Sequence, residues 1–375
     1  MTDRRIDKLA ELIVDYSLDV QSGNLFEING TLLATPLVEK IFEVALLRGA
    51  HPYISSTIPG LEEQFLALAD EEQLQHVSVI EQLVVNQFDA RIHLMSAENT
   101  KALSQVDPGR QVMRNLAHNE IWQKSKGRRA RGELRECYAL FPTDGYAQDA
   151  DMSLRAFENL VYRASLVYEA DPVAAWNEVH RCQQELVDFL DLKETLRVVA
   201  AETDITLSVS GRVFVNCSGK INLPDGEVFT SPVEDGVDGH IRFTYPIVTR
   251  GRQIEDVRLW FENGRVVKAT AEKNEVFLHQ MLDTDQGARY LGEFAIGTNP
   301  YMVHFTKNAH LDEKIGGTIH LALGNSFPEV GGRNQSAIHW DMVCDLRNGE
   351  IYADGQLFYR AGELLGDLSW PFRPE

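Results

Sequence analysis

The segment spanning residues 312–345 constrains the fold of this chain more than any other part of the sequence. It sets His320, His339 and Asp341 among mostly apolar residues, and the run TIHLAL at residues 318–323 is typical of a β-strand. His339 and Asp341 are separated by one residue, and alternate residues of a strand share a face, so both side chains can reach the same point. Imidazole and carboxylate groups are ligands of zinc, cobalt, manganese and iron, and a bound cation would offset the cost of placing them among apolar neighbours.

Two glutamates further upstream favour a metal site over ordinary strand histidines. On its own, a histidine in a strand is more often a core or surface residue with an ordinary hydrogen bond. Glu227 and Glu293 each follow a glycine and precede apolar residues, and each taken singly reads as a surface glutamate. Together with His320, His339 and Asp341 they make five ligand-type side chains, whereas a mononuclear zinc site needs three. The set fits two divalent ions about 3.5–4 Å apart that share a bridging carboxylate and activate a bridging water.

Charge and cysteine content narrow the function further. The 375 residues suggest about two domains, and the net charge of -20, from 56 acidic and 36 basic residues, disfavours nucleic acid or an anionic membrane surface as a partner. The four cysteines are scattered without C-x-x-C spacing, which predicts neither a disulfide framework nor a thiolate zinc site and favours a cytoplasmic location. We expect no signal peptide and no membrane span, because no apolar run is long enough.

Strand-like and helix-like segments alternate through the first half of the chain. The spacing predicts strands at residues 25–28, 51–55, 90–95 and 136–140, and helices from residue 35 and at residues 61–69, 72–87, 108–125 and 153–167. Such alternation argues for an N-terminal layered α/β domain, residues 1–195, with a mostly parallel sheet and helices on both faces. No G-x-G-x-x-G follows the first strand and no Walker-type sequence is present, so nucleotide binding is unsupported.

The pattern changes near Leu196 to one typical of antiparallel sheet. Residues 205–209 alternate apolar side chains with Thr and Ser, and Asn263-Gly264 lies between two apolar runs, which is a strong signal for a type I′ hairpin turn. One helix is predicted, at residues 275–282. We therefore expect a C-terminal α+β domain, residues 196–375, that is rich in antiparallel strands and carries the metal site.

A group of basic residues follows the predicted helix at residues 108–125. The first interpretation is a solvated helix end and loop. The alternative is a patch that meets an acidic surface across a dimer or attracts a peptide carboxylate. The group consists of Lys124, Lys126, Arg128, Arg129, Arg131 and Arg135.

Several segments spread over nearly the whole chain carry a family resemblance. In the first half they are YSL at residues 16–18, GAHPY at 49–53, VDP at 106–108 and LFPT at 140–143. In the second half they are the segments around Glu227 and Glu293 and residues 312–324 and 338–345. At these positions the sequence resembles the thermophilic metallo-aminopeptidase family, of the aminopeptidase T and aminopeptidase S type.

The resemblance implies a metal-dependent aminopeptidase that removes N-terminal amino acids from peptides with broad side-chain preference. It implies two divalent metal ions, zinc, cobalt or manganese, held by Glu227, Glu293, His320, His339 and Asp341. Either Glu227 or Glu293 would then double as the proton shuttle, which makes these two the candidate catalytic residues. The family also implies a two-domain homodimer that encloses its active sites in an internal cavity.

One departure from the family pattern concerns Phe327. Seven residues after the histidine matched by His320, the family usually has a tyrosine near the metals. A phenol can donate a hydrogen bond to a developing oxyanion, whereas a phenyl ring cannot. A non-catalytic peptide-binding relative of the same fold is therefore one alternative function.

A second alternative is a mononuclear non-haem iron enzyme that cleaves aromatic rings. His320, His339 and Asp341 alone satisfy the two-histidine, one-carboxylate pattern of such oxygenases. Glu227 and Glu293 discriminate between the two functions, because an oxygenase needs neither as a ligand. Glu313 lies close by in sequence and reads first as a loop carboxylate, with a supporting role around the metals as the alternative.

Overall fold

The computed structural model describes residues 3–249, 252–366, 368 and 370–372. The chain divides into two compact units, residues 1–173 with 219–224 and residues 174–218 with 225–375. Within the described residues, no helix combines the length and the apolar character that crossing a bilayer requires.

The first unit is built on a parallel sheet with the strand order β2-β1-β3-β4-β8. Its strands are β1 (Leu25–Thr31), β2 (His51–Thr57), β3 (Ala90–Met95), β4 (Arg135–Leu140) and β8 (Asn222–Leu223). All neighbouring pairs run parallel, as the alternation of strand and helix predicts. The short strand β8 is the exception in sequence, because it comes from the second half of the chain and pairs with Tyr138 and Ala139 of β4.

Local signals in the sequence place the helices of the first unit. They are α1 (Arg4–Leu12), α2 (Thr35–Leu47), α3 (Leu61–Leu68), α4 (Glu71–Gln75), α5 (Val79–Gln87), α6 (Pro108–Ala130), α7 (Asp144–Asp149) and α8 (Leu154–Ala164). Asp107 caps α6 by accepting from the backbone N–H of Gly109. The single helix expected at residues 72–87 was wrong, because His76 leaves the helical conformation at a ψ of 125° and the Ser78 side chain caps a new helix.

The two faces of this parallel sheet differ in polarity. Ile92 and Leu94 of β3 are buried on one face, whereas Arg91 and His93 alternate with them and lie on the other. On that polar face, Arg91 and His93 line a cavity of about 470 Å³ together with Glu136 of β4 and residues of α5 and α6. The charged side chains there bond one another, so this face carries a buried ionic network where an apolar surface is usual for a parallel sheet.

The second unit contains two antiparallel sheets. The larger has the order β14-β13-β10-β6-β5-β18-β19-β20 and the smaller has the order β17-β16-β15-β9-β7. The strands of the larger sheet are β5 (Thr195–Ala200), β6 (Thr203–Ser208), β10 (Val237–Arg242), β13 (Arg258–Glu262), β14 (Arg265–Thr270), β18 (Glu350–Ala353), β19 (Gln356–Arg360) and β20 (Glu363–Leu364). Asn263 and Gly264 join β13 to β14 with φ angles of 47° and 79°, as the predicted type I′ turn requires. The parallel and antiparallel sheets together confirm the expected mixed α/β fold class.

The smaller sheet of the second unit is buried at its centre. Its strands are β7 (Val215–Cys217), β9 (Glu227–Thr230), β15 (Leu291–Gly297), β16 (Thr318–Gly324) and β17 (His339–Asp345), and a separate hairpin consists of β11 (Ile247–Thr249) and β12 (Arg252–Ile254). Every residue of β9, β15 and β16 is buried. Apolar side chains from one face of this sheet and from the larger sheet share a single core.

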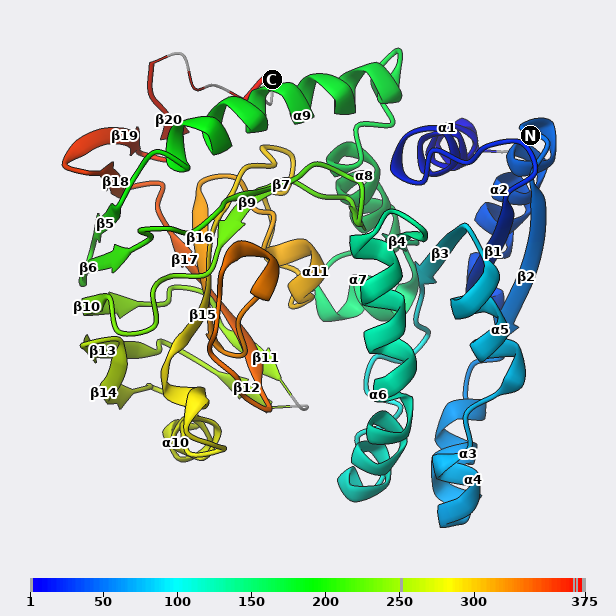
Figure 1. Ribbon diagram of the computed structural model, residues 1–375, viewed down its shortest axis with the longest axis horizontal. Helices are drawn as coiled ribbons and strands as arrows, with labels where there is room; N and C mark the ends of the chain where they lie inside the picture. Colours follow the sequence, from blue (N-terminus) through cyan, green and yellow to red (C-terminus); the bar gives the residue numbers. More distant parts are fainter. Residues whose placement is uncertain (1–2, 250–251, 367, 369, 373–375) are drawn as a thin grey trace. The chain divides into compact units, whose positions relative to one another are not determined.

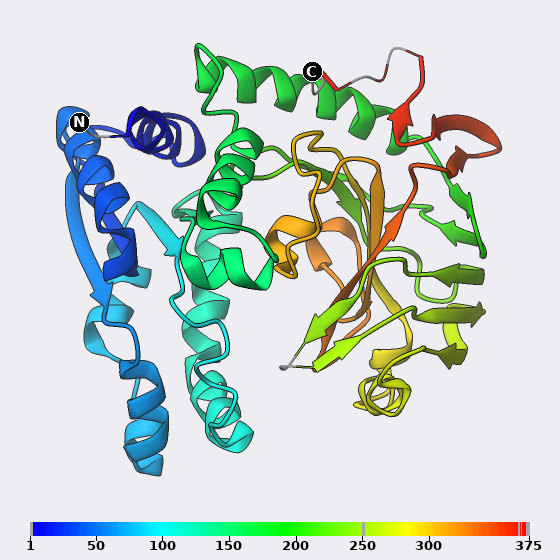
Figure 2. The ribbon, with the colours of Figure 1, turned by 180° about the vertical axis from the view of Figure 1, so that it is seen from behind.

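Helices lie at opposite ends of the second unit (Figures 1 and 2). They are α9 (Pro172–Leu190) at one end and α10 (Glu275–Leu282) at the other. Leu186 of α9 and Leu278 of α10 both join the core between the sheets. The compact units divide between residues 173 and 174, in the first turn of α9, whereas the sequence placed the domain boundary between residues 195 and 196.

Candidate metal centre

The five side chains predicted as metal ligands lie on one face of the smaller sheet. Strand alternation explains this, because residues adjacent to the ligands point the other way into the core: Val228 follows Glu227, Phe294 follows Glu293, Leu321 follows His320, and Trp340 separates His339 from Asp341. Register brings the strands into line, since Ala322 of β16 pairs with Glu293 on one side and with Asp341 on the other. The sheet therefore presents acids and imidazoles from four strands to one place.

These side chains form two groups that meet at Glu293. In one, single ligand atoms of Glu293, His339 and Asp341 lie within 4.8 Å of one another. The Nε2 atom of His339 is 3.0 Å from Glu293 Oε2 and 3.4 Å from Asp341 Oδ1. The other carboxylate oxygen of Glu293, Oε1, is 3.7 Å from the Nε2 atom of His320. Glu293 thus extends one oxygen toward each histidine, which is the geometry expected of a bridging carboxylate.

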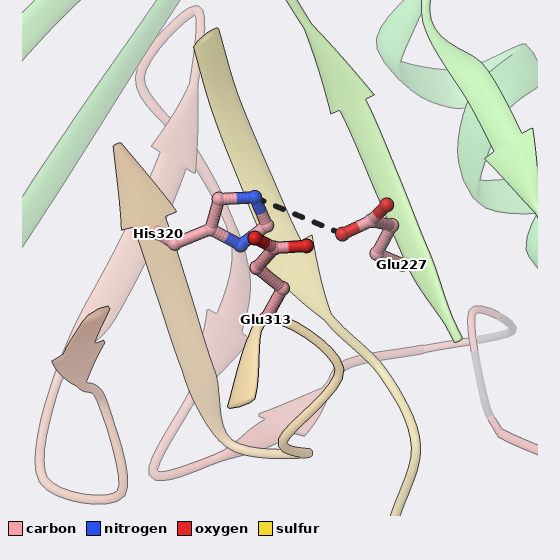
Figure 3. A group of neighbouring side chains, drawn as sticks. All are labelled: Glu227, Glu313 and His320. Atoms are coloured by element: carbon pink, nitrogen blue, oxygen red, sulfur yellow. Dashed lines mark ion pairs between the residues drawn. The ribbon is translucent and has the colours of Figure 1, made fainter. Parts of the chain in front are cut away.

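The second group includes Glu313, which the sequence interpretation read first as a loop carboxylate and only second as a residue that supports the metals. Glu227, Glu313 and His320 also offer ligand atoms within 4.8 Å of one another, and Figure 3 shows the Glu313 side chain directed toward the other two. Glu227 Oε2 is 3.7 Å from His320 Nε2. Glu313 follows the short helix α11 (Ala309–Asp312), so it is in a loop, but its carboxylate belongs to the centre. The glycine turn at Gly316-Gly317, just before β16, is the one local signal that the chain folds back here.

A lysine is buried at the same place. Lys314 is fully buried, and its Nζ atom is 2.6 Å from Glu227 Oε1 and 3.4 Å from Glu313 Oε2. Its distance to Asp225 Oδ1 is 3.8 Å. The cluster therefore holds five carboxylates, those of Asp225, Glu227, Glu293, Glu313 and Asp341, around one permanent cation.

Several polar atoms of the cluster lack hydrogen-bond partners, which is the test of whether a metal fits. Among the described residues, Glu227 Oε2, His320 Nδ1 and Asp341 Oδ1 are buried and make no hydrogen bond. Buried polar atoms are normally satisfied, so orphaned carboxylate oxygens that face imidazole nitrogens point to an additional cation. His339 is oriented for this role, because its Nδ1 atom lies 2.8 Å from the backbone oxygen of Asn325 and leaves Nε2 directed at the acids. The donor set thus fits divalent metal ions.

The protonation behaviour of the cluster reflects the same surplus of negative charge. Burial alone would lower the pKa of His339, but the neighbouring carboxylates of Asp341 and Glu293 outweigh it and raise the pKa to about 11. Burial, reinforced by the charge of Asp341, raises the pKa of Glu313 to about 8. For Glu293, burial would raise the pKa, but the two histidines lower it to about 2. Without metal, the cluster therefore takes up protons to offset its carboxylates.

The centre opens into a small cavity of about 150 Å³. Glu313, His339 and Asp341 line one side of it, and apolar side chains including Val248 and Phe305 line another. A volume near 150 Å³ is enough for a group the size of benzene. The cavity thus has an apolar wall beside the acids, and its volume is that of about one amino-acid side chain.

Phe327 lies against His339, one of the side chains that line this cavity. Its ring packs edge-on against His339, with ring centroids 5.1 Å apart, and against Phe229 at the same distance. The position is therefore beside the centre, as the resemblance implies. Tyr245, a tyrosine of the same unit that is a candidate to supply the missing phenol, accepts a hydrogen bond from Arg347 at 3.0 Å.

Comparisons with known proteins agree over nearly the whole chain. The model of a family described as thermophilic metalloprotease (M29) matches residues 2–364. Aminopeptidase 2 of Geobacillus stearothermophilus is 29% identical over an alignment of 413 residues, which covers 98% of this chain and 99% of that protein. The structure of wild-type AmpT from Thermus thermophilus is similar at a TM-score of 0.85 and 24% identity, over 97% of this chain and 99% of that one.

A second solved structure shares the fold more distantly. The 2,5-dihydroxypyridine dioxygenase of Pseudomonas putida KT2440 is similar at a TM-score of 0.59 and 13% identity, over 97% of this chain and 98% of that one. This likeness concerns the fold alone, because side chains that determine chemistry can change completely at such identity.

Proposed function

The chain belongs to the thermophilic metalloprotease family (M29), and from this premise we propose that it is a metal-dependent aminopeptidase that removes N-terminal amino acids from peptides. The names of the relatives support the activity, since Aminopeptidase 2 aligns over 98% of this chain. The observation that carries the proposal is the cluster of acids and imidazoles on one sheet face, joined at Glu293.

We assign two divalent ions, zinc, cobalt or manganese, to the two groups of side chains. Glu227, Glu313 and His320 would hold one, and Glu293, His339 and Asp341 would hold the other, with Glu293 positioned to touch both. Bound metal ions would supply a water of lowered pKa and a Lewis acid for the scissile carbonyl. This assignment keeps the five residues expected from the sequence and adds Glu313.

The remaining chemistry falls to the glutamates. Glu293 has a lowered pKa of about 2, so its carboxylate is ionised at neutral pH and, with one oxygen directed at each histidine, suits a bridging ligand better than a proton shuttle. Glu313 lines the cavity, so one oxygen of its carboxylate could pass a proton from the attacking water to the leaving amine while the other holds the metal. Glu227, the other expected catalytic residue, is less available for proton transfer because Lys314 engages its Oε1 atom.

Selectivity for the free N-terminus follows from the acids at the cavity. The substrate amine is a cation at neutral pH, and Asp341 and Glu313 present carboxyl groups on the wall where it would enter. The limited volume of about 150 Å³ leaves room for one side chain beside them.

We also propose that the protein is a cytoplasmic homodimer, as expected from the sequence and the resemblance. Light scattering coupled to gel filtration measures whether it is a dimer.

One assay tests the proposed function. Release of free amino acids from short peptides is measured with zinc, cobalt or manganese added, next to the metal content of each sample. We expect metal-dependent release that stops on addition of a chelator, and two ions per chain. A single iron per chain with oxygen uptake on dihydroxypyridines would favour the dioxygenase alternative. Metal binding without turnover would favour a non-catalytic peptide-binding protein.

A matched variant separates loss of the site from loss of the fold. His279→Ala removes an imidazole from α10, outside the cluster, and we expect it to keep full activity. If Asp341→Ala folds like His279→Ala and still cleaves peptides at the normal rate, the assignment of the site is wrong.

A further inference from the structure

Lys314 carries a positive charge in the cluster that metal binding does not remove, whereas the histidines lose their protons when they become ligands. Its ammonium group contacts Glu227 Oε1 at 2.6 Å and Glu313 Oε2 at 3.4 Å, so it bonds both carboxylates of one metal-binding group. The ion pairs of the other group, Glu293, His339 and Asp341, are with imidazole only. Lys314 Nζ also lies 3.8 Å from Asp225 Oδ1, so its half holds one lysine among three carboxylates, whereas the other half, in the described part of the chain, holds two carboxylates and no lysine.

The backbone fixes this lysine in place. The carbonyl oxygen of Lys314 accepts a hydrogen bond from the N–H of Asn299 at 3.0 Å, and its own N–H donates to Leu311 at 3.1 Å. The side chain is fully buried, so the ammonium group cannot move out to solvent without opening the structure. Lys314 is thus a permanent part of the Glu227–Glu313–His320 group.

The contacts of Lys314 leave room for a metal on the same carboxylates. Lys314 takes Oε1 of Glu227, whereas Oε2 faces His320 Nε2 at 3.7 Å and makes no hydrogen bond with any described residue. A metal at this half would use Oε2 and would not need to displace the lysine. It would, however, sit within a few ångströms of a like charge in a poorly solvated interior, where repulsion is strong.

We propose that Lys314 is a built-in cation that holds Glu227 and Glu313 in position when metal is absent and makes their half of the centre the weaker of two divalent-metal sites. The inference rests on the proposed dinuclear centre. The contacts support the asymmetry: Lys314 occupies oxygens of Glu227 and Glu313, whereas the ion pairs of Glu293 and Asp341 among the described residues are with histidines, which can give up their protons to a metal. Buried carboxylates without a counter-charge are strongly destabilising, which explains why the lysine also stabilises the metal-free fold.

Lys314→Gln tests this directly, because glutamine removes the charge but can still donate a hydrogen bond to Glu227. Zinc affinities of the purified full-length protein are measured by competition with a chromogenic chelator, and thermal unfolding is measured with and without zinc. We expect two unequal zinc sites in the wild type. In Lys314→Gln the weaker site should tighten by at least about tenfold, the metal-free melting temperature should fall, and the rise in melting temperature on adding zinc should grow.

A second pair of variants identifies which half of the centre changes its zinc affinity. His339→Ala disables the Glu293–His339–Asp341 half, so the remaining zinc affinity reports the half that contains Lys314. Adding Lys314→Gln to this background should tighten the remaining site by the same factor. Lys220→Gln is the matched control, since Lys220 is a partly buried lysine that donates to the Tyr16 backbone in the first unit, and it should leave both zinc affinities unchanged.

The outcomes distinguish this inference from the proposed function. Two equal zinc sites in a wild type that cleaves peptides, or unchanged affinities in Lys314→Gln, would overturn the role of Lys314 and leave the aminopeptidase intact. A wild type that binds no divalent metal would overturn the proposed function. Lys314→Gln could turn out to fold only when zinc is present. The loss of the metal-free fold would then support the inference. In that case the zinc affinity of the weaker site is measured on Lys314→Met that has been purified with zinc bound.

Discussion

Two buried clusters of charge, one in each unit, satisfy their carboxylates in different ways. In the first unit, Glu136 lies 2.9 Å from His93, 3.5 Å from Arg129 and 3.7 Å from Arg91, and Arg91 also pairs with Glu27. In the second unit, the carboxylates around Glu293 outnumber the single lysine. The first cluster is therefore complete with the cations of the protein itself, and the second is not.

This difference explains why one cluster is structural and the other is a candidate for catalysis. For Glu136, burial would raise the pKa, but the hydrogen bond from His93 and the charges of Arg91 and Arg129 lower it. For Glu313, burial and the charge of Asp341 raise the pKa to about 8, because Lys314 is not enough to offset them. A buried charge alone thus says little about function. The missing counter-charge is the informative feature.

We expect the largest change in activity when a proposed metal ligand is removed from the second cluster. His339→Ala should lower kcat/KM for short peptides by at least about 1,000-fold, because it removes the imidazole that Glu293 and Asp341 share. Metal content should fall with it. His93→Ala, which removes an imidazole from the first cluster, is the control and should change neither metal content nor kcat by more than a few-fold. Equal losses in both variants would break the distinction.

A change in the first cluster should instead affect stability. Glu136→Ala leaves Arg91 and Arg129 without their shared carboxylate, so we expect the free energy of unfolding to fall by about 3–5 kcal/mol. Urea unfolding measures this, and the loss should be the same with and without zinc. A loss that zinc reverses would mean that this cluster also binds metal.

Phe327→Tyr should increase the rate of peptide cleavage at the second cluster. The ring lies beside His339, so a hydroxyl there could donate to an oxyanion formed in the cavity. We expect kcat to rise by about tenfold, below the effect of a fully evolved donor. Steady-state kinetics at constant metal content check it, and an unchanged or lower kcat would show that another group supplies the donor.

Glu136 of the first cluster and His339 of the second should act on opposite ends of the pH–stability curve of the metal-free protein. The lowered pKa of Glu136 stabilises the fold above the unfolded value of about 4.3, and this contribution is lost as the pH falls below it. The raised pKa of His339, about 11, stabilises the fold fully below about pH 6.5, and this contribution is lost as the pH rises toward 11.

Unfolding free energies between pH 3 and pH 10 test this assignment. Glu136→Gln should flatten the acid side of the curve, and His339→Ala should flatten the alkaline side. Saturating zinc should remove the alkaline dependence of the wild type, because the metal replaces the proton on the imidazole. An alkaline side that His339→Ala leaves unchanged would contradict the raised pKa.

Strand periodicity made much of the second unit predictable. The spacing of His339 and Asp341 places both on one face of β17, and the turn at Asn263-Gly264 fixes a hairpin, since both features depend only on neighbouring residues. Glu313 and Lys314 were beyond such reasoning. Their side chains reach the cluster through a loop whose course depends on long-range contacts, including the bonds of Lys314 and Gly316 to Asn299.

In the first unit, the type of each strand was predictable but the partners of its charges were not. The alternation of Arg91 and His93 with Ile92 and Leu94 signals a strand with two unlike faces. Which acid they meet depends on the register between β3 and β4 and on α6, which contributes Arg129. Of the basic group noted in the sequence, Arg129 joins this network and Arg128 donates to the backbone oxygens of Val85 and Phe88, so these two are structural.

Anomalous scattering from crystals soaked in zinc shows directly whether the second cluster holds two metal ions and the first holds none. We expect two peaks in the second unit, one ligated by Glu227, Glu313 and His320, the other by His339 and Asp341, with Glu293 between them. No peak should lie beside Glu136. A single peak at His320, His339 and Asp341 with Glu227 and Glu313 turned away, or no peak at all, would contradict this expectation.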